Sequence, residues 1–229
     1  MIPSIPSSLA LPLTLALLAT GCGRSRDASI PDAAADREQA APADSTRRLV
    51  FLGTSLTAGY GLPDPSLAYP ALIQKRIDAA RLGYRVVNAG VSGATSADTR
   101  RSIDWIMTDP VEVLVIETGA NDGLRGLDVD SLAANIQAII DRARRQSPPP
   151  RIALVGMEAP PNYGAEYTRR FRAVFPGLAR ANGVAFIPFL LTGVAGIDSL
   201  NQGDGIHPTP SGQRIIAGNV WRVLEPLLR

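Results

Sequence analysis

In the stretch VFLGTSLTAGYGL, residues 50–62, an apolar run leads directly into a turn rich in glycine. The apolar residues 50–52 predict a buried strand, and Gly53–Thr54–Ser55 predict a tight turn where that strand ends. Such a turn would hold the Ser55 hydroxyl at the edge of a sheet. Ser55 is therefore a candidate nucleophile, and a helix cap is the alternative interpretation.

Four more apolar runs follow along the chain, and together they predict a parallel sheet. They are nearly continuous and rich in β-branched residues, as expected of strands that are buried on both faces. Amphipathic segments of helical length separate them, so the pattern predicts an α/β fold with helices on both faces of the sheet. Pro176 should kink or split the helix that contains it. The expected strands are 48–53, 84–90, 111–119, 151–157 and 184–189, and the expected helices are 66–82, 130–146, 164–183 and 209–228.

The N-terminal residues predict export. Residues 1–22 carry no charge, and residues 9–19, LALPLTLALLA, have the length of a signal-peptide core. The core ends at ATGC, which resembles a bacterial lipoprotein signal with Cys22 as the lipidated residue. No Lys or Arg precedes the core, and Ala19 stands where leucine is usual. An ordinary secretory signal, or an unprocessed apolar N-terminus, is the alternative. We expect a periplasmic protein or a membrane-anchored lipoprotein.

Residues 23–46 are rich in Ala, Asp, Arg, Pro and Ser, which predicts a flexible linker before a folded domain at 47–229. The net charge of +2 implies no broad basic face, so we expect no nucleic-acid partner. The sequence has one histidine and one cysteine, which excludes a zinc site built from these residues and any intramolecular disulfide.

Polar and small residues follow the predicted strands, at the edge where parallel α/β sheets bind their ligands. Ser55 follows the first strand, Gly93 the second and Asn121 the third, whereas Asp204 and His207 lie well beyond the fifth. These residues therefore predict one active site at the carboxyl edge of the sheet.

A serine needs a base to become a nucleophile, and few side chains in this sequence could serve. His207 is the only histidine, while Lys75, the only lysine, lies within a charged helical segment. Asp204 precedes His207 by three residues, so a turn could bring its carboxylate to Nδ1 and leave Nε2 for Ser55. A surface histidine at the start of a helix is the alternative.

Acyl transfer also needs donors for the oxyanion that forms on the substrate. The backbone N–H groups of Ser55 and Gly93 and the side-chain amide of Asn121 are the candidates. A turn glycine and a capping asparagine are the alternative interpretations of Gly93 and Asn121.

Four segments in this order resemble the SGNH (GDSL-type) hydrolases, which are named for a Ser, a Gly, an Asn and a His. They are GTSLTAGYGL, NAGVSGATS, GANDGLRG and DGIHPTPSG, and they extend through nearly the whole domain. Within that family the sequence is most similar to the group of bacterial arylesterases and multifunctional acyl-CoA thioesterase I/lysophospholipases. The resemblance implies a three-layer αβα sandwich of the flavodoxin type with a five-stranded parallel sheet.

The resemblance also implies roles for individual residues. Ser55 would be the nucleophile, Asp204 and His207 would complete the triad, and Gly93 and Asn121 would bind the oxyanion. The chain departs from the family pattern at Thr54, where an Asp is usual; the threonine keeps a hydroxyl for local hydrogen bonds but carries no charge.

The expected activity is hydrolysis of small-molecule acyl esters or thioesters by a monomer, through an acyl-enzyme and without a metal or organic cofactor. A carbohydrate acetylesterase is the alternative enzyme, and a non-catalytic module that binds lipid or glycan on the same fold is the alternative from another class. The acyl-binding wall should come from residues 157–163 and 190–203. Within these, Leu190, Leu191, Val194 and Ile197 either line it or belong to the core.

Overall fold

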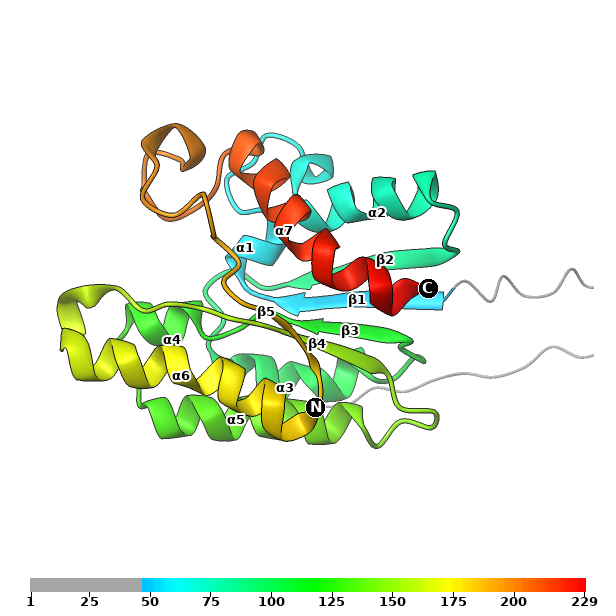
Figure 1. Ribbon diagram of the computed structural model, residues 1–229, viewed down its shortest axis with the longest axis horizontal. Coiled ribbons are helices and arrows are strands. Elements are labelled where there is room, and N and C mark those ends of the chain that lie inside the picture. The colour runs from blue at the N-terminus through cyan, green and yellow to red at the C-terminus, as the bar shows by residue number, and fades with distance from the viewer. Residues whose placement is uncertain (1–46) are drawn as a thin grey trace, which may run out of the picture. The chain divides into compact units, whose positions relative to one another are not determined.

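Five parallel strands form a single sheet, and helices cover both of its faces (Figure 1). The computed structural model describes residues 47–229; the predicted signal segment 1–22 with Cys22 and the predicted linker 23–46 lie outside the described residues. The sheet order is β2-β1-β3-β4-β5. The strands are β1 (Arg47–Gly53), β2 (Tyr84–Gly90), β3 (Val113–Ile116), β4 (Arg151–Val155) and β5 (Ala185–Ile187). The predicted α/β fold with a five-stranded parallel sheet is confirmed.

The helices form the outer two layers. Figure 1 shows α2 and α7 on one face of the sheet and α3, α5 and α6 on the other, and neighbours within each layer contact each other. The α-helices are α1 (Ser55–Ala58), α2 (Tyr69–Ala79), α3 (Ser96–Ile106), α4 (Ala120–Leu124), α5 (Val129–Ala143), α6 (Gly164–Asn182) and α7 (Pro210–Leu228). Short 3₁₀ turns lie at Pro65–Leu67, Pro161–Tyr163 and Asp198–Leu200. Helices α1, α3 and α4 were not among the expected helices.

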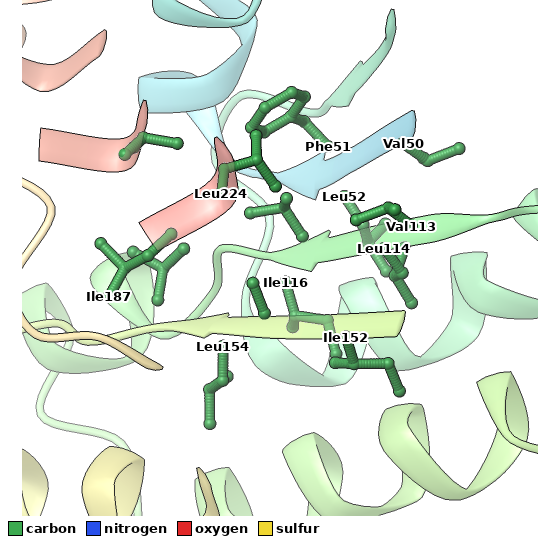
Figure 2. Packing of buried hydrophobic residues seen from close by; sticks show 14 of the residues in the cluster. Val50, Phe51, Leu52, Val113, Leu114, Ile116, Ile152, Leu154, Ile187 and Leu224 are labelled. Atoms are coloured by element: carbon green, nitrogen blue, oxygen red, sulfur yellow. The ribbon is translucent and has the colours of Figure 1, made fainter. Parts of the chain in front are cut away.

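The core lies on both sides of the sheet, which explains why the strand sequences are continuously apolar. In Figure 2, Phe51 lies on the side of Leu224 from α7, whereas Leu154 lies on the other side. The Phe51 ring also meets Tyr69 of α2 edge to face, with the ring centroids 5.4 Å apart. Burial of apolar side chains in both helix layers therefore fixes the sheet between them.

The structure corrects the bounds of three predicted strands and one feature of a predicted helix. The third strand spans Val113–Ile116 rather than 111–119, because its pairing with β1 and β4 is confined to these residues. The fourth and fifth strands end at Val155 and Ile187 rather than at residues 157 and 189. Helix α6 continues through Pro176, so the expected split is wrong. Phe171, Phe175 and Ala179 on either side of Pro176 are buried, and this packing outweighs a cost of roughly 3 kcal/mol for an interior proline.

The order of the strands creates a site at the carboxyl edge. The chain passes from β1 to β2 on one side, and β3 then pairs with the other side of β1. The segments that follow β1 and β3 run to helix layers on opposite faces of the sheet. Where the connections of two adjacent strands diverge in this way, a crevice forms beyond the strand ends. Ser55 follows β1 and Asn121 follows β3, so this crevice lies where the sequence predicts the site.

Among residues 47–229, none of the helices has both the length and the apolar character that a membrane crossing requires.

Candidate active site

The first residue of α1 is Ser55, held in a turn that leaves β1 without any intervening loop. Thr54 has an extended backbone and caps α1, because its hydroxyl accepts a hydrogen bond from the N–H of Leu56. Gly59 ends the helix after a single turn, with a left-handed φ of 78°. The Ser55 hydroxyl is therefore presented beyond the carboxyl edge of the sheet, as the sequence predicts.

A turn brings Asp204 and His207 together just before α7. One carboxylate oxygen, Oδ1, accepts the backbone N–H groups of Ile206 and His207 at 2.9 and 3.0 Å. The other, Oδ2, lies 2.7 Å from Nδ1 of His207. The backbone N–H of His207, its ring and the N–H of Ile206 hold the pKa of Asp204 well below its usual range. An ionised Asp204 accepts only, so the Nδ1 proton points toward it and Nε2 is an acceptor.

The Nε2 atom of His207 lies 2.9 Å from the hydroxyl oxygen of Ser55. The structure thus brings Ser55, His207 and Asp204 into one hydrogen-bonded chain. The ring of Tyr60 covers one side of the imidazole, with the ring centroids 4.7 Å apart. This contact was not anticipated from the sequence, although Tyr60 lies within the same motif as Ser55.

Gly93 and Asn121 line the same cavity as Ser55 and His207. Gly93 has a φ of +80°, a conformation that side chains other than glycine rarely adopt. The guanidinium of Arg125 donates to its carbonyl at 3.0 Å and fixes the orientation of that peptide. Asn121 donates one amide hydrogen to the carbonyl of Ala94 at 2.9 Å, so its second hydrogen has a fixed direction.

A buried network joins the two segments that carry Gly93 and Asn121. Asp122 accepts both the backbone N–H and the hydroxyl of Ser96, at 2.8 and 2.6 Å. Ser96 begins α3, three residues after Gly93, and Asp122 directly follows Asn121. The Asp122–Ser96 contact therefore fixes the spacing between Gly93 and Asn121, two of the three predicted oxyanion donors.

The cavity has a volume of about 560 Å³, and most of its lining is apolar. Its apolar residues include Leu56, Met157, Ala159, Pro160, Phe189, Leu191, Ala195 and Ile206. Of the four leucine, valine and isoleucine residues singled out from the sequence, Leu191 lines the cavity. Leu190 and Val194 are fully buried in the core, and Ile197 is exposed and not part of the lining. The sequence could have revealed Ile206, which stands between Asp204 and His207.

Across residues 47–229, no three His, Cys, Asp or Glu side chains are grouped in a way that could hold a metal ion. The groups that meet at the cavity are a serine, an imidazole, a carboxylate and amide donors. A serine joined through histidine to aspartate is the arrangement by which many hydrolases activate a serine nucleophile.

Residues 51–215 match the GDSL-like Lipase/Acylhydrolase family, and the chain belongs to that family. It is 38% identical over 185 residues to the esterase TesA of Pseudomonas aeruginosa, covering 80% of this chain and 90% of that protein. It is 35% identical over 192 residues to the thioesterase 1/protease 1/lysophospholipase L1 of Escherichia coli K12, covering 83% and 88%. The crystal structure of TesA superposes with a TM-score of 0.75, at 38% identity, over 79% of this chain and 99% of that one.

The resemblance to the SGNH (GDSL-type) hydrolases is thereby confirmed, and with it the fold that the resemblance implies. The chain is a serine hydrolase that acts on ester bonds.

Proposed function

We propose that this domain hydrolyses acyl esters and thioesters with Ser55 as the nucleophile, His207 as the base and Asp204 as the residue that orients it. The observation that carries the proposal is the chain of contacts from Asp204 Oδ2 to His207 Nδ1 at 2.7 Å and from His207 Nε2 to Ser55 Oγ at 2.9 Å. These three residues line a cavity whose other lining is mostly apolar, which suits an acyl group.

Acylation begins when Ser55 attacks the carbonyl carbon of the substrate and His207 takes the hydroxyl proton through Nε2. The negative charge of Asp204 stabilises the imidazolium that results, and its contact with Nδ1 keeps the ring oriented. His207 then gives the proton to the leaving alcohol or thiol. A water molecule, activated by the same histidine, hydrolyses the acyl-enzyme and regenerates Ser55.

Three donors would bind the oxyanion: the backbone N–H groups of Ser55 and Gly93 and the Nδ2 group of Asn121. Support comes from their common cavity and from the contacts that orient them, Arg125 on the Gly93 carbonyl and the Ala94 carbonyl on Asn121. Donors held in place before the reaction stabilise developing charge without reorganisation. Every step of the cycle uses side chains and backbone groups of this chain and water.

The lining of the cavity supports an acyl chain rather than a sugar as the main recognition element. The side chains with polar groups that line it are Ser55, Tyr60, Ser92, Asn121, Glu158, Asp204 and His207. Four of these seven take part in the proposed chemistry, namely Ser55, Asn121, Asp204 and His207. The other three leave few groups to bind sugar hydroxyls. We therefore favour an esterase or thioesterase over a carbohydrate acetylesterase.

A fluorophosphonate probe tests the nucleophile directly, because it reacts only with an activated serine. The wild-type protein should be labelled, and the Ser55→Ala variant should not. Absence of labelling in the folded wild-type protein would reject the proposal and favour a binding module.

A series of substrates tests which class of ester the enzyme prefers. p-Nitrophenyl acetate, p-nitrophenyl octanoate, octanoyl-CoA and palmitoyl-CoA are compared with an acetylated oligosaccharide. We expect higher kcat/KM for an octanoyl ester than for the acetylated sugar, and the reverse order would establish the acetylesterase.

We further propose that the domain is exported and is held at a membrane by a lipid on Cys22, and that it works as a monomer. Support for the anchor comes from the sequence of residues 1–22 alone. Incorporation of labelled palmitate by the wild-type chain, and its loss in Cys22→Ser, would test it. The oligomeric state is measured by light scattering.

A further inference from the structure

A carboxyl group that takes no part in the proposed cycle lies directly beneath the nucleophile turn. Glu117 is the first residue after β3, and its side chain is fully buried. Its Oε2 accepts the backbone N–H of Thr54 at 2.7 Å and the hydroxyl of Thr57 at 2.8 Å. The hydroxyl of Thr54 also donates to this carboxyl group, at 2.9 Å to Oε2 and 3.0 Å to Oε1.

These three donors come from the residues on either side of Ser55. Thr54 precedes the nucleophile, and Thr57 lies two residues after it in α1. A single acceptor therefore holds both sides of the turn, and it does so from the neighbouring strand rather than from within the turn. Neither Glu117 nor the two threonines line the cavity, so this group does not touch the substrate.

The arrangement leaves little freedom around the carboxyl group. The Tyr69 hydroxyl lies 2.7 Å from the Thr57 hydroxyl. Because Thr57 gives its only hydroxyl hydrogen to Glu117, Tyr69 must be the donor in that contact. A Cβ on Gly53 would lie 2.1 Å from the Thr57 hydroxyl oxygen and 2.7 Å from Oε2 of Glu117, so only glycine fits there. The network thus explains the glycine that ends β1.

A buried carboxyl group is costly unless it is paired or fully hydrogen-bonded. Burial raises the pKa of Glu117, although the hydrogen bonds from Thr54 and Thr57 oppose this effect. Within residues 47–229, no Arg, Lys or His side chain forms an ion pair with Glu117. The hydrogen bonds to its carboxyl group all come from the turn that carries Ser55.

We infer that Glu117 is a positioning residue for catalysis, which accepts hydrogen bonds from Thr54 and Thr57 and thereby holds the Ser55 hydroxyl within reach of Nε2 of His207. The inference rests on the proposed role of Ser55. The residue before the nucleophile, Thr54, is neutral, and the carboxyl group that holds the turn in place comes from Glu117 instead. The group acts through hydrogen-bond acceptance, and a neutral acceptor of the same shape can replace it.

The test compares Glu117→Met, Glu117→Gln and Thr57→Val in the full chain, with Glu112→Met as the matched control. Glu112 lies just before the other end of β3, half exposed, where it pairs with Arg151 away from the cavity. For each variant, kcat and KM for p-nitrophenyl octanoate are measured per folded protein, and the rate of fluorophosphonate labelling and the melting temperature are recorded.

Glu117→Met should lower kcat and the labelling rate by roughly 10- to 100-fold, the scale of a small misplacement of a reacting group, with KM within about twofold of wild type. Glu117→Gln should keep both rates within about threefold, because its amide oxygen still accepts from Thr54 and Thr57. Glu112→Met should leave both rates unchanged. If Glu117→Met does not fold, Thr57→Val carries the same expectation of a lower kcat at unchanged KM.

A wild-type kcat in folded Glu117→Met, or in Thr57→Val, would overturn the inference. It would also be overturned if Glu117→Gln lost as much activity as Glu117→Met, since the charge rather than the hydrogen bonds would then matter. Failure of the proposed function gives a different result, because the wild-type protein itself would then escape the probe.

Discussion

Ser55 and His207 are 152 positions apart in the sequence, and their side chains meet at 2.9 Å. Ser55 follows the interior strand β1, whereas His207 lies in a turn before the last helix, α7. The two segments approach each other because both lie at the carboxyl edge of the parallel sheet. Their contact is the basis of the first prediction.

Replacement of His207 by alanine should lower kcat for p-nitrophenyl esters by several orders of magnitude, toward the roughly 10⁶-fold scale of triad deletions. The sequence contains no second histidine that could take over the proton transfer. Steady-state kinetics of the purified variant, with circular dichroism to verify folding, provides the measurement. Turnover near the wild-type rate in a folded His207→Ala protein would exclude the proposed triad.

Replacement of Asn121 by alanine should lower kcat by roughly 10²–10³, the usual cost of losing one oxyanion donor. The Asn121 amide is held by the Ala94 carbonyl and faces the cavity of Ser55. Asn219→Ala is the matched control, because that amide lies on the surface and donates to the carbonyl of Thr192. Equal rates for the two variants would remove Asn121 from the oxyanion site.

Asp204 should make the native state sensitive to acid. Its folded pKa is lowered by the backbone and ring of His207, so its stabilising contribution is present above its unfolded pKa of about 3.9. This contribution is lost as the pH falls below that value toward the folded pKa. The difference in unfolding free energy between wild type and Asp204→Asn should therefore shrink as the pH is lowered below about 4. A difference that is independent of pH in urea titrations would contradict the prediction.

Glu117 should have the opposite effect on the pH dependence of stability. Burial raises its folded pKa above the ordinary value of 4.5, so the unfolded state loses this proton first as the pH rises. The stabilising contribution of Glu117 is thus complete below 4.5 and is lost as the pH rises through the folded pKa. Glu117→Gln should gain stability relative to wild type over that interval. The melting temperatures of both proteins, measured over a series of pH values, provide the test. Melting temperatures that change in parallel with pH would contradict the prediction.

Leu191 should influence the preferred length of the acyl chain. It lines the cavity, whereas Ile197 in the same loop is exposed and lies outside the lining. Leu191→Trp should lower kcat/KM for the octanoyl ester relative to the acetyl ester by roughly tenfold, because the larger ring occupies space that a longer chain needs. Ile197→Trp is the control and should leave this ratio unchanged. The same ratio in both variants would place the acyl chain elsewhere.

Much of the fold could be predicted from the sequence because its strands are buried on both faces. Residues 50–52 and the four later apolar runs are continuous, and each strand found in the structure lies within, or one residue beyond, a predicted range. Helix α3 escaped prediction because its sequence, SADTRRSIDWI, has few apolar residues. Its capping box of Thr95 and Asp98 was the available signal.

The residues of the candidate site could be predicted from the sequence for a different reason. A chain with one histidine leaves few ways to activate a serine, so Ser55, Asp204 and His207 could be selected by elimination. Glu117 could not be found in this way, because the run VIETG reads as the end of a buried strand. Its role depends on contacts with Thr54 and Thr57, which lie about 60 positions earlier in the chain. Contacts of that kind are decided by packing in three dimensions.

Arg47 and Ser55 stand at opposite ends of β1, so the place where the described chain begins lies more than roughly 20 Å from the nucleophile. The end of α7 lies at the same edge of the sheet as the start of β1, since Arg151 at the start of β4 donates a hydrogen bond to the carbonyl of Leu227. A fusion partner or a solid support attached at either end of this domain would thus lie at the edge of the sheet opposite the cavity that holds Ser55. Immobilised enzyme should retain access to bulky or aggregated esters.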